Sequence, residues 1–187
     1  MRHGAYPNVY SGYQAVDAEE NRCKMEKAWG VEGLPSTPGL TLTEHIDAAG
    51  DEIKSMFILG ENPMLSFPDI NHVRTSLQRL DFLVVQDIFL TETAELADVV
   101  LPAACWAEKD GTFTNAERRV QRIRKAVDPP GDARADWEII TALAHALGLN
   151  GFDFTSVKDV YDDMRKVTPQ YAGITYERIE RPVSLVL

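Results

Sequence analysis

Three polar side chains that can bind a nucleotide follow a short strand-like run in the middle of the chain. Gln86, Asp87 and Thr91 come after the apolar run Phe82 to Val85. A carboxylate such as Asp87 suits guanine, because its two oxygens accept from the ring N–H and the exocyclic amine together. Ribose hydroxyls are the other natural partners. Taken alone, Asp87 fits the cap of a helical turn at least as well, so the residues leave both roles open.

A second strand-like run, Val99 to Leu101, is followed by the polar loop Glu108 to Arg119. A short segment of Thr, Glu and Ala joins the two runs and indicates a helical turn, which is typical of a parallel αβ unit. Ligands bind beyond the carboxyl ends of such strands. The sequence therefore predicts one crevice for a polar, nucleotide-like ligand. In the loop, Lys109 offers an ammonium group to phosphate oxygens, although a solvated charge is the ordinary interpretation.

The loop Gly60 to Pro63 ends an earlier strand-like run, Ile53 to Leu59. A residue without Cβ at that point lets the backbone approach a ligand or adopt a positive φ. An ordinary turn glycine is an equal alternative. The spacing is not GxGxxG, so the fingerprint of NAD-binding proteins is absent.

The elements that must position these loops alternate in type along the chain. Apolar residues at helical spacing predict a helix from Pro68 to Leu80 between two strands. We predict a three-layer, doubly wound α/β fold with a mainly parallel, Rossmann-like sheet and a helical carboxy-terminal part. Residues 1–127 are expected to form the α/β region, and 128–187 a helical extension that packs on it in one compact domain. The other predicted helices are Ala18 to Trp29, Leu40 to Ala49, Trp137 to Leu147 with Asp136 as its cap, and a segment after Ser156.

Composition excludes several classes of function. The formal net charge of −10 over 187 residues argues against nonspecific nucleic-acid binding, because phosphate contact needs clustered Lys and Arg. The exception is the basic cluster Arg118, Arg119, Arg122, Arg124 and Lys125. No apolar run approaches the ~20 residues of a membrane span, so no direct membrane insertion is expected. Cys23 and Cys105 lie far apart without CxxC spacing, and a metal site built from this chain alone is not expected.

Several segments carry a family resemblance. VVQDIFLTETAELADVVLP, followed by EKDGTFTNAERR, resembles the molybdopterin oxidoreductases, which hold molybdenum or tungsten between two molybdopterin guanine dinucleotides. Within that family, four further segments resemble the catalytic (alpha) subunit of formate dehydrogenases: Gly4 to Gln14, Ala28 to Gly30, Gly60 to Pro63 and Arg134 to Trp137. A nitrate reductase of the same family, or a noncatalytic scaffold domain related to respiratory-complex subunits, is the alternative.

The resemblance implies a middle, cofactor-binding fragment of a longer enzyme. The family's amino-terminal iron–sulfur motif, its catalytic Cys or selenocysteine with a neighbouring His, and its carboxy-terminal domain have no counterpart in these residues. We therefore expect the fragment to be inactive, whereas the parent oxidises formate to carbon dioxide with transfer of two electrons. The implied cofactors are bis-molybdopterin guanine dinucleotide with molybdenum or tungsten, and an iron–sulfur cluster in the missing amino-terminal domain. The implied partners are the remaining domains of the same polypeptide and an electron-transfer subunit. We expect the cytoplasm as location unless the parent is exported.

The same resemblance implies which residues contact the cofactor. The loop at Gly60 would meet a guanosine end, and Asn62 and Ser66 would hydrogen-bond ribose or phosphate, although family members often carry Asp at the position of Asn62. Lys109 would contact the cofactor, and Asp136 would lie at the nucleotide, in competition with its role as a helix cap. The full set of expected cofactor-binding residues is Gly60, Glu61, Asn62, Ser66, Gln86, Asp87, Thr91, Lys109 and Asp136, with no catalytic residue and no metal ligand.

Overall fold

The computed structural model describes residues 6–181 and divides into two compact units. The first, which we call the sheet unit, comprises Leu40–Glu108 and Val127–Ile139. The second, the hairpin unit, comprises the described parts of Met1–Gly39, Lys109–Ala126 and Ile140–Leu187. The expected division at residue 127 into an α/β domain and a helical extension stays a prediction. The first two residues of the segment Gly4 to Gln14, which resembles formate dehydrogenases, lie outside the described residues.

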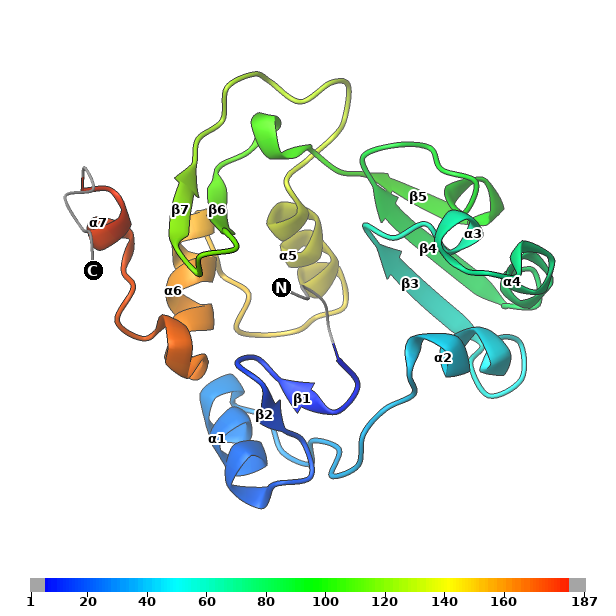
Figure 1. Cartoon of the computed structure of the whole chain (residues 1–187), viewed down its shortest axis with the longest axis horizontal. Coiled ribbons are helices and arrows are strands. Elements are labelled where there is room, and N and C mark those ends of the chain that lie inside the picture. Colours follow the sequence, from blue (N-terminus) through cyan, green and yellow to red (C-terminus); the bar gives the residue numbers. More distant parts are fainter. Residues whose placement is uncertain (1–5, 182–187) are drawn as a thin grey trace. The chain divides into compact units, whose positions relative to one another are not determined.

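Three parallel strands form the centre of the sheet unit (Figure 1). They are β3 (Ser55–Leu59), β4 (Phe82–Asp87) and β5 (Val99–Pro102), adjacent in that order. The predicted α/β class with parallel strands is thereby confirmed. The predicted end of the middle strand at Val85 was wrong, because the ladder to β5 continues for two more residues.

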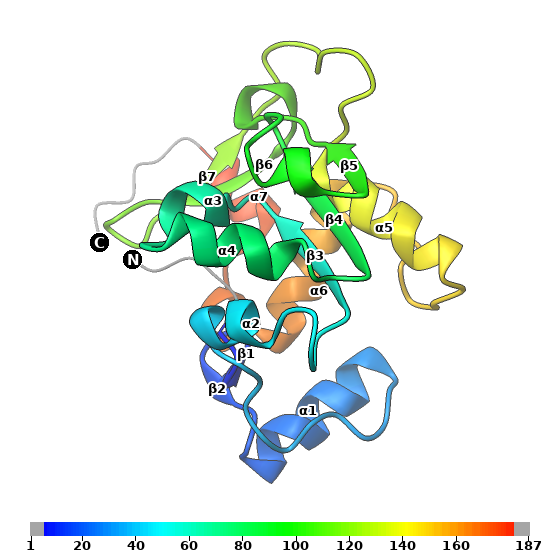
Figure 2. The same cartoon turned by 90° about the vertical axis from the view of Figure 1, so that its right-hand side faces the viewer.

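Helices cover one face of this sheet (Figure 2). They are α2 (Leu42–Ala48), α3 (Pro63–Ser66) and α4 (Ile70–Leu77). Alternate strand residues such as Ile58, Leu83 and Val85 point to these helices, and Val73 and Leu77 of α4 meet them in one buried cluster. The predicted apolar stripe is therefore the core-facing side of α4. The helix begins later than predicted because Asp69 caps it, accepting a hydrogen bond from His72 N at 3.0 Å.

The segment between β4 and β5 is a single 3-10 turn, η1 (Ala94–Leu96), as the prediction of a helical turn anticipated. The hydroxyl of Thr91 accepts a hydrogen bond from Ala94 N at 3.2 Å at the start of this turn. After β5, the chain makes the short turn η2 (Trp106–Glu108). A later segment then lies beside the end of β5, where Ala103 pairs with Arg134 in an isolated parallel bridge.

The hairpin unit contains two short antiparallel pairs and several helices. The predicted polar loop from Glu108 to Arg119 was wrong in part, because Gly111–Thr114 (β6) pairs with Val120–Ile123 (β7). Arg118 adopts a positive φ of 64° in the turn, which allows the chain to reverse. The remaining elements are β1 (Val9–Tyr10), β2 (Gln14–Ala15), α1 (Glu19–Trp29), α6 (Val157–Val167), η3 (Pro169–Tyr171) and α7 (Tyr176–Ile179). Helix α5 (Asp136–Ala146) begins in the sheet unit and ends in the hairpin unit.

Candidate functional site

The three parallel strands bring their carboxyl ends to one edge of the sheet. Leu59 of β3 lies opposite Gln86 of β4, and Gln86 lies opposite Leu101 of β5. Directly after β3, Gly60 N donates a hydrogen bond to the carbonyl oxygen of Gln86 at 2.9 Å. The sequence reasoning was therefore right to bring the loop after β3 and the end of β4 together. We call this region, made of 60–63, 86–87 and 91–93, the carboxyl edge.

Gly60 leaves open space at the carboxyl edge. Its φ is 63°, a left-handed conformation that favours glycine. Among the described residues, a Cβ built on Gly60 would meet no atom within 4 Å beyond those of its two chain neighbours. The backbone at this position is therefore open to a close approach by another molecule, as the sequence reasoning required.

The side-chain amide of Asn62 forms hydrogen bonds through both its nitrogen and its oxygen to the loop after β4. Its Nδ2 donates to Glu92 Oε2 at 2.8 Å, and its Oδ1 accepts from Thr93 Oγ1 at 2.7 Å. The hydrogen bond from Asn62 is the main cause that lowers the pKa of the Glu92 carboxyl below its ordinary value. The sequence reasoning missed Glu92 and Thr93. Their signal in the sequence was the polar Thr–Glu–Thr segment at 91–93, which three residues separate from the end of β4.

Two other predicted residues of the first loop pair with each other. The hydroxyl of Ser66, at the end of α3, donates to Glu61 Oε1 at 2.5 Å. Ser66 is exposed and Glu61 is half buried. They therefore lie within reach of solvent at the carboxyl edge, and a ligand there would compete with their mutual hydrogen bond.

Asp87 holds the turn that follows β4. Its Oδ1 accepts hydrogen bonds from Ile88 N at 2.7 Å and from Phe89 N at 3.2 Å. This is the local turn that Asp side chains make with the following backbone. Asp87 thus caps its own turn, whereas Thr91 meets the first N–H of the 3-10 turn downstream.

Gln86 carries a buried polar group whose bonding is incomplete. The side chain is 1% exposed, and its Nε2 donates to Asp136 Oδ1 at 2.8 Å. Within residues 6–181, no hydrogen-bond partner meets its Oε1. A buried acceptor without a donor costs about 1–3 kcal/mol. A molecule that offers an N–H or O–H group would remove this cost.

Asp136 is not the N-cap that the sequence suggested. Helix α5 begins at Asp136 itself, and the residue before it, Ala135, accepts the first helical hydrogen bond, from Ile139 N at 3.2 Å. Glu138 supports the same end, since its Oε2 accepts from Ala135 N at 3.2 Å. The Asp136 side chain accepts the hydrogen bond of Gln86 Nε2 instead of occupying the cap position.

Lys109 is assigned to the hairpin unit, whereas the other predicted residues belong to the sheet unit. It lies two residues before the start of β6 and is half buried. Its predicted contact with a cofactor stays a prediction.

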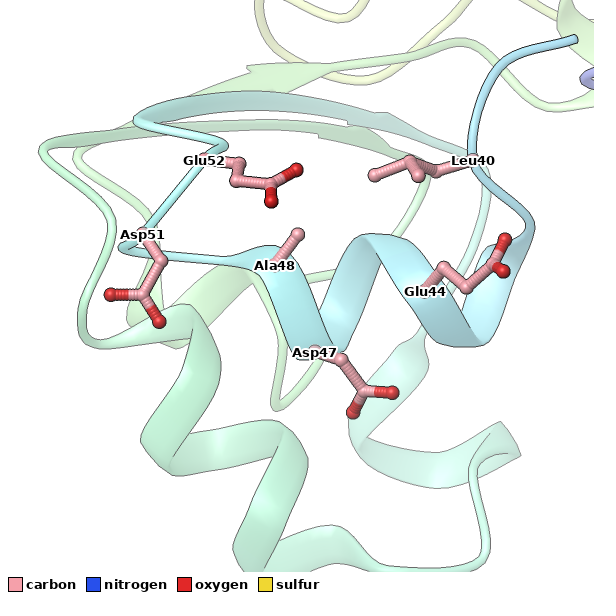
Figure 3. Close-up of a pocket in the computed structure, with 6 residues that line it drawn as sticks. All are labelled: Leu40, Glu44, Asp47, Ala48, Asp51 and Glu52. Atoms are coloured by element: carbon pink, nitrogen blue, oxygen red, sulfur yellow. The ribbon is translucent and has the colours of Figure 1, made fainter.

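A surface pocket lies away from the carboxyl edge (Figure 3). It involves α2 and the loop before β3, which is the amino end of that strand. Asp47 pairs with His72 at 2.8 Å, and Asp51 forms an ion pair with Arg79. Four carboxylates around one pocket repel phosphate, so this is not the nucleotide site. The lining residues are Leu40, Glu44, Asp47, Ala48, Asp51 and Glu52.

The described residues contain no cluster of three or more His, Cys, Asp or Glu side chains arranged to hold a metal ion. Both cysteines are free thiols, Cys23 exposed and Cys105 half buried. Within the same part of the chain, no helix has the length and apolar character of a membrane span.

The chain resembles known proteins in family, sequence and fold. A profile of the family "Molybdopterin oxidoreductase" matches residues 3–146. The chain is 59% identical over 178 residues to the F420-dependent formate dehydrogenase subunit alpha of Methanocaldococcus jannaschii. This match covers 95% of the present chain and 26% of the relative. It is 46% identical to the probable oxidoreductase YjgC of Bacillus subtilis, over 95% of this chain and 18% of that protein. The chain thus spans about a quarter or less of the length of these relatives.

A similarity to a solved structure supports the fold. The acetylene hydratase of Pelobacter acetylenicus superimposes with a TM-score of 0.62 over 92% of this chain and 24% of the hydratase, at 23% sequence identity. The two chains therefore share an architecture.

Proposed function

Because this chain belongs to the molybdopterin oxidoreductase family, we propose that it is the guanosine-binding portion of the catalytic subunit of a formate dehydrogenase. The observation that carries the binding role is the carboxyl edge, where an open glycine lies beside a buried acceptor that lacks a donor. The choice of formate is supported by relatives named formate dehydrogenase alpha subunits, which are 54–59% identical over at least 94% of the chain.

The residues of the carboxyl edge fit the nucleotide end of a molybdopterin guanine dinucleotide. Gly60 admits a close approach to the backbone, and the guanosine N–H and O–H groups are donors of the kind that Gln86 Oε1 lacks. Glu61, Ser66 and Asp87 add exposed or half-buried polar groups. When bound, the cofactor supplies a two-electron redox centre with molybdenum or tungsten. The role of this chain is to bind and orient the nucleotide end.

The proposed parent acts with partners outside this chain. We propose that the remaining domains of the same polypeptide supply the catalytic residues and an iron–sulfur cluster, and that a separate subunit accepts the electrons. A nitrate reductase of the same family is the alternative activity. A noncatalytic scaffold is the alternative of a different class, and the carboxyl edge described above speaks against it.

The activity is tested in the longer protein, purified without oxygen. We expect formate to reduce a viologen dye in proportion to the bound molybdenum or tungsten. The 187-residue chain alone, given the same cofactor, should show no formate-dependent reduction. Oxidation of reduced dye by nitrate without any formate activity would favour the nitrate reductase, and a protein that retains neither metal nor activity would favour the scaffold.

Gly60→Ala in the longer protein should lower cofactor retention more than stability. The left-handed φ costs a residue with Cβ about 1–2 kcal/mol, and no clash with the residues that the structure describes adds to it. Gly33→Ala is the matched control, since Gly33 also has a positive φ and open space around its Cβ position. We expect similar losses of melting temperature and a loss of bound metal in the Gly60 variant alone. Equal metal content in both variants would contradict a close approach at Gly60.

A further inference from the structure

Asn62 connects the two loops that form the carboxyl edge. It follows β3, whereas its partners Glu92 and Thr93 belong to the segment after β4. Thr93 is fully buried, and its hydroxyl also accepts a hydrogen bond from Met64 N at 3.1 Å. One side chain thus bonds to two residues that lie about thirty positions further along the chain.

The orientation of the Asn62 amide follows from charge. If the amide were reversed, its oxygen would face the Glu92 carboxylate and its N–H group would face the Thr93 hydroxyl, which already accepts from Met64 N. A hydrogen bond from an amide to a carboxylate is charge-assisted and stronger than a neutral one. Both ends of the amide are therefore committed to the loop after β4.

We propose that Asn62 is a positioning residue, which ties the loop after β3 to the loop after β4 and thereby sets the spacing of the guanosine-binding edge, without contacting the nucleotide itself. The inference rests on the proposed binding function and reassigns one residue within it. Gly60 N is held at the carbonyl oxygen of Gln86, so a loss of the Asn62 tie moves the residues that follow Gly60 relative to the loop after β4.

The test is a charge swap across the bond between Asn62 and Glu92. Asn62→Asp places two carboxylates where the structure has a hydrogen bond of 2.8 Å, although Thr93 can still donate to Asp. Adding Glu92→Gln restores a bond of reversed polarity, because the Gln amide donates to the new carboxylate. Asn71→Asp makes the same chemical change at an exposed position of α4 and serves as the control.

Two properties are measured on the 187-residue chain, at a temperature where circular dichroism shows each variant folded. One is the affinity for GDP by ligand-observed NMR, and the other is hydrogen exchange of the amides in 60–62 and 91–93. We expect Asn62→Asp to weaken GDP binding about tenfold, from the loss of a charge-assisted bond, and to speed exchange in both loops. The double variant should return to within about twofold of wild type, and the control should bind as wild type does.

Failure of the inference about Asn62 can be distinguished from failure of the proposed function. If Asn62 contacted the nucleotide, the double variant would bind as weakly as Asn62→Asp, since the amide is not restored. Unchanged GDP affinity and unchanged hydrogen exchange in Asn62→Asp would also overturn the inference. The proposed function would stand in that case, provided that the wild-type chain binds GDP. No GDP binding by wild type would overturn both. Should Asn62→Asp not fold, Glu92→Ala breaks the same bond from the other side and must show the same loss of affinity.

Discussion

Gly50→Ala is expected to destabilise the sheet unit severely. Gly50 has a φ of 83°, and a Cβ added to it would overlap the Cβ of Arg79 and lie 2.8 Å from the Arg79 carbonyl oxygen. Left-handed backbone costs a residue with Cβ about 1–2 kcal/mol. Overpacking against backbone adds about 1–3 kcal/mol. The free energy of unfolding, measured by urea denaturation, should therefore fall by roughly 2–5 kcal/mol.

The matched control is again Gly33→Ala, because Gly33 has a positive φ of 76° but no atom of residues 6–181, its chain neighbours aside, within 4 Å of the added Cβ. It should lose only the strain of about 1–2 kcal/mol. The difference between the two variants measures the contact of the turn before β3 with the turn before β4. Equal losses would show that this contact yields without cost and would contradict the prediction.

Asp136→Ala is expected to have the largest effect on cofactor retention. Asp136 accepts the hydrogen bond of Gln86 Nε2, and Gln86 is fully buried with its Oε1 unpaired among the described residues. Without the Asp136 carboxylate, Gln86 Nε2 loses its acceptor as well, at a cost of about 1–3 kcal/mol in the free energy of unfolding. The amide then loses its fixed orientation at the edge where we propose that guanosine binds. Bound metal and melting temperature are compared in one preparation of the longer protein.

Asp136→Asn separates the hydrogen bond from the charge. The Asn oxygen can still accept from Gln86, so stability should stay within about 1 kcal/mol of wild type, while the neutral pair can also form with both amides reversed. Cofactor retention should lie between those of wild type and Asp136→Ala. A lowered melting temperature with full metal content in both variants would show that the pair of Gln86 and Asp136 serves only the fold.

Local patterns in the sequence predicted the elements of the sheet unit well. Short apolar runs marked strands at Ile53 to Leu59 and Phe82 to Val85, of which the first begins at Ser55 in the structure. A stripe at helical spacing marked α4, because side-chain burial dictates both patterns. The end of β4 could not be read in this way. Gln86 and Asp87 are polar, yet they remain in the strand because the ladder to β5 uses only backbone groups.

Contacts between residues far apart in the chain could not be predicted from local sequence patterns. Gln86 and Asp136 were each expected at the cofactor, but their hydrogen bond joins residues fifty positions apart. No local pattern contains such a bond, since it depends on where α5 begins after the Arg134 bridge. The pairing of Gly111–Thr114 with Val120–Ile123 is local, but it was missed because this polar segment resembles a loop.

The most direct test of the account compares two nucleotides on the wild-type 187-residue chain. Gln86 Oε1 and the Asp87 carboxylate are acceptors at the carboxyl edge, and guanine presents a ring N–H beside an amine where adenine has an acceptor nitrogen beside its amine. Calorimetry at millimolar nucleotide should therefore show GDP binding at least about tenfold more tightly than ADP, which corresponds to about 1.4 kcal/mol. Equal affinity for the two nucleotides, or no binding of either, would contradict a guanosine-binding site in this chain.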